Sequence, residues 1–245
     1  MEHKFNKPLN LIVEGNIGAG KSTFLSIVKK NLDLDIIYEP HEQWQSVAGE
    51  HNLLELFYSD TKRWAYAFQT YAFVSRVVAQ EKAKKEATKT LLFERSVYSD
   101  RYCFAKNCYE MGTMTALEWS LYKEWFSWLV ETHVTPPDGF IYLKASPECC
   151  LDRIFKRQRE EERNVPLSYI EKLYEKHEEW LINKIDLTKS LLNVPVLILD
   201  CEKEFQNNFN VQQEMAQKLI EKFGVLPSIN FKNKKDEIFL VKKSI

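Results

Sequence analysis

The chain has 245 residues, of which 44% are hydrophobic and 28% are charged, and its formal net charge is −1. This length and composition fit one large α/β domain or two small ones with a sizeable core. A net charge near zero argues against a general affinity for nucleic acid, and no apolar run approaches the roughly 20 residues that a membrane span needs.

The cysteines and the N-terminus predict a cytoplasmic location. The five cysteines are odd in number and form no CxxC pair, and two adjacent ones cannot easily bridge each other or build a zinc site. The first residues, MEHKFNKP, contain no apolar signal core. We therefore expect reduced cysteines at Cys103, Cys108, Cys149, Cys150 and Cys201.

The segment from Leu9 to Thr23, LNLIVEGNIGAGKST, matches the phosphate-binding pattern GxxxxGK[ST]. Glycines let the backbone turn tightly so that successive N–H groups face phosphate oxygens, while the lysine reaches the terminal phosphates and the serine hydroxyl reaches Mg²⁺. An apolar run precedes the loop and a helical pattern follows it, which favours a nucleoside triphosphate site over a structural turn. The predicted contacts are Gly15, Asn16, Ile17, Gly18, Ala19, Gly20, Lys21, Ser22 and Thr23.

Short apolar runs alternate with helical patterns along the rest of the chain. Further strands are predicted at 35–38, 90–93, 140–143 and 196–200. Helices are predicted after the loop, at 53–58, from 61 to about 87, at 98–110, from Thr115 (with Glu118 as a capping box), from Ser146 (before a proline), from 166 to about 192, and up to Gly224.

Continuous apolar strands separated by helices are typical of a parallel sheet that is buried on both faces. We therefore predict a single α/β domain in which a five-stranded parallel sheet is flanked by helices. The predicted domain covers residues 1–224, with the phosphate loop at 15–23 and a lid at about 153–165, and residues 225–245 form a polar tail.

Ligands of such a sheet bind beyond the carboxyl ends of the strands, where the sequence places Glu14, Glu39, Glu94, Arg95, Lys144 and Asp200. Phosphoryl transfer needs phosphate positioning, charge neutralisation and a base for the attacking hydroxyl. Glu94 is expected beside Mg²⁺ held by Ser22, Glu39 is the candidate base, and Arg95 can hold a substrate oxygen or a second carboxylate. Each alone fits a surface residue equally well, but three together beside the loop favour a site.

A cationic RxxxRxR pattern, formed by Arg153, Arg157 and Arg159, lies at a predicted helix end. Residues four apart share a helix face. The ordinary interpretation of such a run is a solvated face that pairs with Glu160, Glu161 and Glu162. Beside a nucleotide site, we favour an arginine lid over the γ-phosphate.

Seven segments together resemble the cellular deoxyribonucleoside kinases, the family of deoxycytidine, deoxyguanosine, mitochondrial thymidine and insect multisubstrate kinases. The resemblance runs in order from about Leu9 to Lys222. Its segments are GNIGAGKST, EPHEQW, NLLELFY, RWAYAFQTYAFVSR, ERSVYSDRYCFA, RIFKRQREEERNVPLSYIEKL and KHEEWL.

The resemblance implies a role for each matching residue. Glu39 corresponds to the general base for the 5′-hydroxyl, Arg95 to the arginine that holds it, and Glu94 to the Mg²⁺-associated acid. Tyr58 and Glu162 match the pair that bonds the sugar 3′-hydroxyl, and Gln69 the bidentate contact with the base edge. Phe68 and Phe104 match the walls of the base slot, with Trp44 and Ile17 nearby; an ordinary core role is the alternative for these aromatics. Arg157 and Arg159 match the lid arginines, and Arg153 the one that stacks on the adenine of ATP.

The preferred base is predicted from three positions, which in this family set the floor of the pocket: Ala72, Arg76 and Asp100. The Arg–Asp pair resembles the deoxycytidine and deoxyguanosine kinases, offers partners to an amino group and crowds a thymine methyl. Three side chains depart from the family pattern, namely His41, Gln43 and Phe57. The short linker at 45–52 is closer to the insect and thymidine members.

We therefore predict an ATP- and Mg²⁺-dependent kinase of the 5′-hydroxyl of deoxycytidine, deoxyadenosine or deoxyguanosine. The alternatives are a thymidine-accepting multisubstrate kinase, a nucleoside monophosphate kinase, and a non-catalytic relative; the last would be marked by loss of Lys21, Glu39 or Arg95, and all three are present. The resemblance also implies a homodimer, for which the Trp-rich helix from Thr115 to His133 is a candidate interface, and no nucleic-acid or membrane partner is expected.

Overall fold

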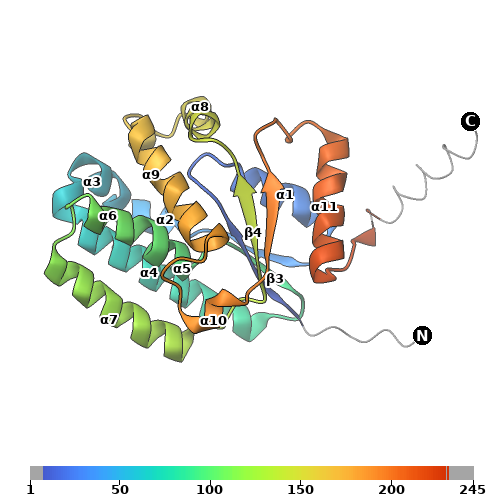
Figure 1. Cartoon of the computed structure of the whole chain (residues 1–245), viewed down its shortest axis with the longest axis horizontal. Helices are drawn as coiled ribbons and strands as arrows, with labels where there is room; N and C mark the ends of the chain where they lie inside the picture. Colours follow the sequence, from blue (N-terminus) through green and yellow to red (C-terminus); the bar gives the residue numbers. More distant parts are fainter. Residues whose placement is uncertain (1–7, 230, 232–245) are drawn as a thin grey trace, which may run out of the picture.

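Five parallel strands form one sheet in the computed structural model, which describes residues 8–229 and 231 (Figure 1). The strand order across the sheet is β2-β3-β1-β4-β5. The strands are β1 (Asn10–Glu14), β2 (Asp35–Ile37), β3 (Leu91–Glu94), β4 (Gly139–Lys144) and β5 (Val196–Asp200). The predicted α/β class and the five-stranded parallel sheet are confirmed.

Helices cover both faces of this sheet, and α1 and α11 lie together on the side opposite to α4 and α7 (Figure 1). The helices are α1 (Lys21–Asn31), α2 (His41–Gln45), α3 (Leu53–Ser59), α4 (Thr61–Glu86), α5 (Val97–Ser99), η1 (Asp100–Ala105), α6 (Lys106–Glu110), α7 (Ala116–His133), α8 (Pro147–Arg157), η2 (Glu160–Glu162), α9 (Leu167–His177), η3 (Glu178–Ile182), α10 (Lys189–Leu192) and α11 (Phe209–Phe223).

The central strand β1 divides the core into two. Leu11 and Val13 point into the cluster that α1, α8 and α11 complete, whereas Ile12 points into the cluster formed with α4 and α7. Successive side chains of a strand face opposite sides of a sheet, so a continuous apolar run is needed where both sides are covered. The sheet register aligns Val13 with Glu94, which brings the ends of β1 and β3 to the same edge.

The predicted helix starts are confirmed. Thr115 and Glu118 form a reciprocal capping box at the beginning of α7, and Ser146 accepts a bond from the backbone N–H of Cys149 at the beginning of α8. The predicted helix at 98–110 is present, but its middle, η1, is π-helical. Wide turns of this kind are frequent at functional sites, and η1 carries two predicted site residues, Asp100 and Phe104.

The helix predicted from 166 to about 192 is wrong in its extent. It is divided into α9, the π-helical η3 and the short α10, with residues 183–188 outside any helix. Lys184 and Asp186 in this break have φ angles of 55° and 60°, which a right-handed helix cannot contain. Leu181 and Leu191, on the two sides of the break, are buried in the same core. Hydrophobic spacing therefore continues where the helix does not.

The residues just after Gly224, which belong to the predicted tail, pack against the domain. The backbone N–H of Ser228 donates to the carbonyl of Asn31, and Val225 and Phe231 are buried. Residues 230 and 232–245 of that predicted tail lie outside the described residues.

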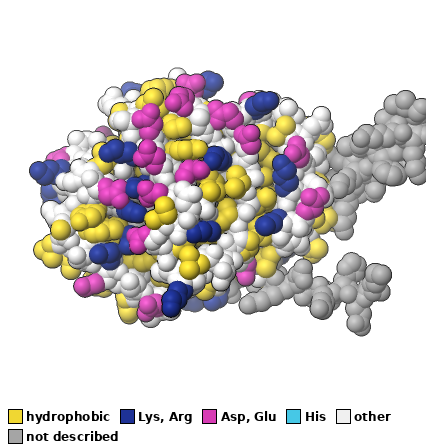
Figure 2. All heavy atoms as spheres, viewed as in Figure 1, with side chains coloured by type: hydrophobic (Ala, Val, Ile, Leu, Met, Phe, Trp, Pro, Cys, Tyr) yellow, Lys and Arg dark blue, Asp and Glu magenta, His cyan; other side chains and the backbone are white. Residues whose placement is uncertain are grey.

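The surface carries mixed charge, since acidic and basic side chains are interspersed over the face in Figure 2. None of the helices in the described part combines the length and the hydropathy that a membrane crossing requires. The five cysteines are free thiols.

Candidate active site

A cavity of about 910 Å³ lies beyond the carboxyl ends of β1, β2 and β3. Its walls come from the phosphate loop, from α3 and α4, from η1, and from the segment that runs from α8 through η2. Of the residues predicted to bind ATP, metal or acceptor, all line this cavity except Gly15, Asn16 and Ala19. One hollow therefore contains both the phosphate loop and the residues predicted to hold an acceptor.

The phosphate loop needs glycine for packing as well as for its backbone angles. A Cβ on Gly18, whose φ is +81°, would lie 2.2 Å from the backbone oxygen of Cys150. The ammonium group of Lys21 donates to the carbonyls of Gly15 (3.1 Å) and Asn16 (2.8 Å). Burial, with Arg95 nearby, lowers the pKa of Lys21 to about 7. A phosphate anion beside this ammonium would favour its charged form.

Asn16 shapes the loop from beneath. Its side-chain amide donates to the carbonyl of Ile170 (2.9 Å) on α9, and its side-chain oxygen accepts from the backbone N–H of Ile17 (2.9 Å). The side chain is buried. Asn16 thus holds the loop against α9, and its side chain does not face the cavity.

Ser22 and Glu94 meet at the end of the loop. The Ser22 hydroxyl donates to Glu94 Oε1 at 2.8 Å. Ser22 lies in the first turn of α1 and Glu94 is the last residue of β3. In the described part of the chain, no group of three or more His, Cys, Asp or Glu side chains is arranged to hold a metal ion. Two protein oxygens beside a phosphate loop fit Mg²⁺, which usually keeps several waters and completes its shell with substrate phosphates.

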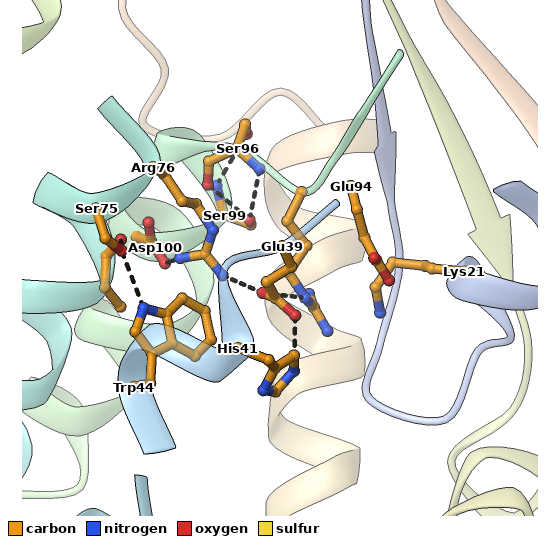
Figure 3. A network of polar contacts seen from close by, with 12 residues as sticks. Lys21, Glu39, His41, Trp44, Ser75, Arg76, Glu94, Ser96, Ser99 and Asp100 are labelled. Atoms are coloured by element: carbon orange, nitrogen blue, oxygen red, sulfur yellow. Dashed lines mark hydrogen bonds and ion pairs between the residues drawn. The ribbon is translucent and has the colours of Figure 1, made fainter. Parts of the chain in front are cut away.

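Glu39 is held by arginines from two elements (Figure 3). Arg76 of α4 donates to Glu39 Oε1 and also to Asp100 Oδ1, and the Arg95 Nε lies 3.4 Å from Glu39 Oε1. Burial raises the pKa of Glu39, but Arg76, the neighbouring His41 and Arg95 outweigh it and hold that pKa well below its ordinary value. Glu39 is therefore ionised at neutral pH.

Asp100 of η1 is the inner end of the same network (Figure 3). Its side chain is 2% exposed, and burial raises its pKa to about 6 against the opposing effect of Arg76. Its second oxygen, Oδ2, is buried and has no hydrogen-bond partner among the described residues. A buried acceptor without a donor is costly, so this oxygen fits a donor group supplied by a ligand.

Aromatic side chains form the slot next to Asp100. Phe57 stacks on Phe68 with ring centroids 4.7 Å apart, and Trp44 meets the edge of Phe68 at 5.6 Å. Phe104 lies beneath the Arg95 guanidinium at 4.7 Å. The Trp44 indole N–H donates to Ser75 Oγ at 2.9 Å, which fixes its orientation.

Gln69, Tyr58 and Glu162 face the same space. Gln69 is buried, and its side chain makes one weak hydrogen bond to the described residues, with Cys108 Sγ at 3.9 Å, so its amide can bind a ligand. Burial and the neighbouring Glu162 carboxylate raise the pKa of Tyr58. Tyr58 is therefore a neutral hydroxyl beside a carboxylate.

The three predicted lid arginines separate into two places. Arg157 pairs with Glu162, and Arg159 lies 3.7 Å from Glu162 Oε1 and 3.2 Å from His41 Nε2. Arg153 instead donates to the carbonyl of Lys203 (3.3 Å) and lies 5.8 Å from the ring centroid of Phe205. Arg157 and Arg159 therefore lie together beside Glu162, and Arg153 lies apart from them, next to an aromatic ring.

Three residues expected at the strand ends do not line the cavity. Lys144 donates to Glu178 (2.6 Å), and Asp200 accepts from the backbone of Glu202. Glu14 is fully buried, where it accepts from Ser96 Oγ (2.6 Å), and burial raises its pKa to about 7. The rule of strand ends gave the correct edge of the sheet but did not separate supporting side chains from lining ones.

Further residues line the cavity without having been predicted as site residues. His41 and Phe57 were noted only as departures from a family pattern, and Leu54, Tyr169 and Phe205 were not considered, although all line the cavity. Phe205 follows β5, so its place beyond a strand end was the available signal. A Cβ on Gly20 would lie 2.7 Å from the Phe205 ring, which shows how closely this ring packs on the loop.

Comparison with known proteins gives a consistent result. The model of a family described as deoxynucleoside kinase matches residues 11–224. The chain is 41% identical to deoxycytidine kinase 1 of Xenopus laevis (90% of this chain, 92% of the relative) and 40% identical to the mitochondrial deoxyguanosine kinase of the same organism (84% and 86%). It is also 40% identical to deoxycytidine kinase of Homo sapiens (85% and 89%).

Proposed function

The chain belongs to the deoxynucleoside kinase family, and we propose that it transfers the γ-phosphoryl group of ATP to the 5′-hydroxyl of deoxycytidine and of purine deoxyribonucleosides. The observation that carries this proposal is the buried Glu39–Arg76–Asp100 network, which shares one cavity with the phosphate loop. It joins a carboxylate suited to an alcohol acceptor with polar groups suited to an amino-bearing base.

Glu39 is the proposed general base. Its low pKa keeps it ionised, and a phosphoryl transfer with a loose transition state asks little basicity before the hydroxyl begins to bond. Arg95 would hold both the carboxylate and the hydroxyl oxygen. Lys21, Arg157 and Arg159 would neutralise charge on the transferring phosphoryl group.

Magnesium is the proposed metal, and Ser22 with Glu94 would hold it. The metal would neutralise the triphosphate and fix its orientation. Within the chain, Glu94 accepts the Ser22 hydroxyl (2.8 Å) and so keeps that oxygen at the end of the loop.

The acceptor would bind on the other side of Glu39. Tyr58 and Glu162 would bond the sugar 3′-hydroxyl, Phe68 and Phe104 would enclose the base, and Gln69 would read its edge. An exocyclic amino group would donate to Asp100 Oδ2, which has no donor among the described residues. Small Ala72 leaves room for a purine.

A thymidine-accepting multisubstrate kinase is the second candidate, favoured by the short linker at 45–52. Initial rates with ATP–Mg²⁺ against deoxycytidine, deoxyadenosine, deoxyguanosine and thymidine distinguish the two. We expect the highest kcat/KM for a cytosine or purine nucleoside and a poor one for thymidine. A kcat/KM that is highest for thymidine would overturn the proposed base preference. No turnover of any of the four nucleosides would overturn the proposed kinase activity.

We further propose a cytoplasmic homodimer that pairs through α7. This helix exposes Leu117, Trp125 and Trp128, the two tryptophans being 49% and 53% exposed. Neighbouring exposed aromatics on one helix are typical of interaction surfaces. Sedimentation that gives a monomer at micromolar concentration would contradict the dimer.

A further inference from the structure

We propose that His41 is a positioning residue that holds the lid arginine Arg159 beside the general base Glu39, and releases it when the imidazole is protonated. This inference rests on the proposed function, because it assigns a partner to the base of that reaction. It concerns a residue that the family pattern does not explain.

The observation is that one ring nitrogen has two partners. His41 begins α2, two residues after Glu39, and its Nε2 lies 3.0 Å from Glu39 Oε2 and 3.2 Å from Arg159 Nη1. Figure 3 shows the imidazole next to the Glu39 carboxylate. The ring is 26% exposed and contacts Trp44 with centroids 5.0 Å apart, so its position is defined while protons can still reach it.

The two partners require opposite protonation states of His41 Nε2. A guanidinium only donates hydrogen bonds and a carboxylate only accepts them, so Nε2 can serve one of them at a time. With its lone pair on Nε2, the neutral ring accepts from Arg159 and leaves Glu39 Oε2 free for a substrate hydroxyl. With a proton on Nε2, the ring instead donates to Glu39.

Protonation of the His41 ring lowers activity through two separate effects. Imidazolium has no acceptor atom and carries a positive charge, so it cannot hold the Arg159 guanidinium and repels it. It also pairs with Glu39 Oε2 and thereby makes that carboxylate a weaker base. Both effects predict that the lid withdraws and the reaction slows as His41 takes up a proton.

The surrounding charged side chains give the two Glu39 oxygens different partners. Arg76 from α4 and Arg95 from the end of β3 both contact Glu39 Oε1, whereas Oε2 contacts His41. From the lid, Glu162 lies 3.7 Å from Arg159 and pairs with Arg157. Glu161 accepts from Gln45 (2.7 Å), the last residue of α2, and from Asn52 (3.2 Å), just before α3, so the same lid also contacts these two helix ends. Oε2 is thus the oxygen open to a hydroxyl, and His41 stands between it and the lid.

The first test is the pH dependence of kcat between about pH 5.5 and pH 8.5 in three proteins. The Glu39 pKa lies well below its ordinary range, but Asp100, with a pKa of about 6, and Lys21, with a pKa of about 7, also change protonation within this pH range. The contribution of His41 is therefore the part of the fall in kcat that H41Q removes. We expect kcat of the wild type to fall about tenfold or more across this range, the worth of one hydrogen bond to a charged group. In H41Q, whose amide donates and accepts through separate atoms, the fall of kcat between about pH 8.5 and pH 5.5 should be at least about threefold smaller than in the wild type.

The control is H51Q. His51 is an exposed histidine ten residues further along the chain that pairs with Glu50 and does not line the cavity, and its replacement should leave the wild-type profile unchanged. A merely structural role of His41 would lower kcat of H41Q equally at every pH and preserve the acid limb. That result would overturn the proposal.

A second readout does not need turnover. The imidazole ¹⁵N shifts of His41, assigned by comparison with H41Q, distinguish the Nε2–H tautomer, the Nδ1–H tautomer and imidazolium. In R159A at pH 8 we expect the ring to move towards the Nε2–H tautomer, because only Glu39 remains as its partner. Unchanged shifts would overturn the contact. An inactive wild type with responsive shifts would overturn the proposed function and leave the contact standing.

Discussion

The cavity has two halves that are built differently. The acceptor half surrounds Glu39, Arg76 and Asp100, where the nucleoside would bind, and the donor half surrounds the phosphate loop, Arg153, Arg157 and Arg159, where ATP would bind. On the acceptor side, the charged side chains are 8% exposed or less, and Arg76, Glu39 and Asp100 bind one another. On the donor side, Arg157 and Arg159 are about a third exposed, at 35% and 34%, and Arg153 contacts a backbone oxygen and the Phe205 ring. The charged side chains of the acceptor half therefore bind one another, whereas the lid arginines of the donor half rest on contacts that a phosphate can replace.

This difference fits what each half has to achieve. Discrimination between bases requires buried polar groups that are left unpaired by the wrong substrate. Neutralising a triphosphate requires cations that can approach it and move away again with the product. The same difference ranks the expected effects of substitution. The effect is largest at the general base Glu39, smaller at Asp100 and smallest at Arg153.

The largest effect is expected at Glu39. E39Q keeps the size of the side chain but removes the proton acceptor, so kcat should fall roughly 10²–10⁴-fold, the usual worth of general acid–base catalysis. The Kd of ATP, measured by titration calorimetry, should stay within about twofold because Glu39 lies on the acceptor side. E42Q is the matched control, since Glu42 is an exposed acid on the same segment that does not line the cavity. Wild-type turnover in E39Q would show that Glu39 is not the base.

The sequence predicted the donor half better than the acceptor half. The phosphate loop, β1 and α1 follow one another within Leu9–Asn31, so local spacing defines the site. The Arg76–Asp100 pair joins α4 to η1 across 24 positions, and only the family resemblance pointed to it. The contact between His41 and Arg159 spans 118 positions and depends on where the lid rests, which no spacing rule describes.

The middle effect is expected at Asp100. Removing it leaves the buried Arg76 guanidinium with Glu39 as its remaining carboxylate partner, and breaking a buried charge pair costs about 3 kcal/mol of unfolding free energy. D100A should therefore unfold at lower urea. In R76M/D100A both members of the buried pair are gone, so the double variant should be more stable than the sum of the two single changes predicts, with a coupling of about 1–3 kcal/mol.

The exposed ion pair between Lys89 and Asp33 is the control for this cycle. Its atoms are 2.6 Å apart, but both side chains are nearly half exposed, and such pairs contribute little. K89A/D33A should show no measurable coupling. Additive changes at Arg76 and Asp100 as well would mean that these two side chains do not stabilise each other and would remove the contrast between the two halves.

The smallest effect is expected at Arg153. Its guanidinium lies near the Phe205 ring and the Lys203 carbonyl, at the donor end of the cavity. Arg153 matches the arginine that stacks on the adenine of ATP, so R153A should raise the KM for ATP about threefold to tenfold, the worth of one partly exposed cation–π contact. The kcat, the KM for the nucleoside and the urea midpoint should stay unchanged. R163A serves as the control, because Arg163 is an exposed arginine of the same segment that pairs with Glu160 and does not line the cavity. A fall in kcat with an unchanged KM for ATP would place Arg153 with the groups that act on the transferring phosphoryl, and the donor half would then be as closely tied to the chemistry as the acceptor half.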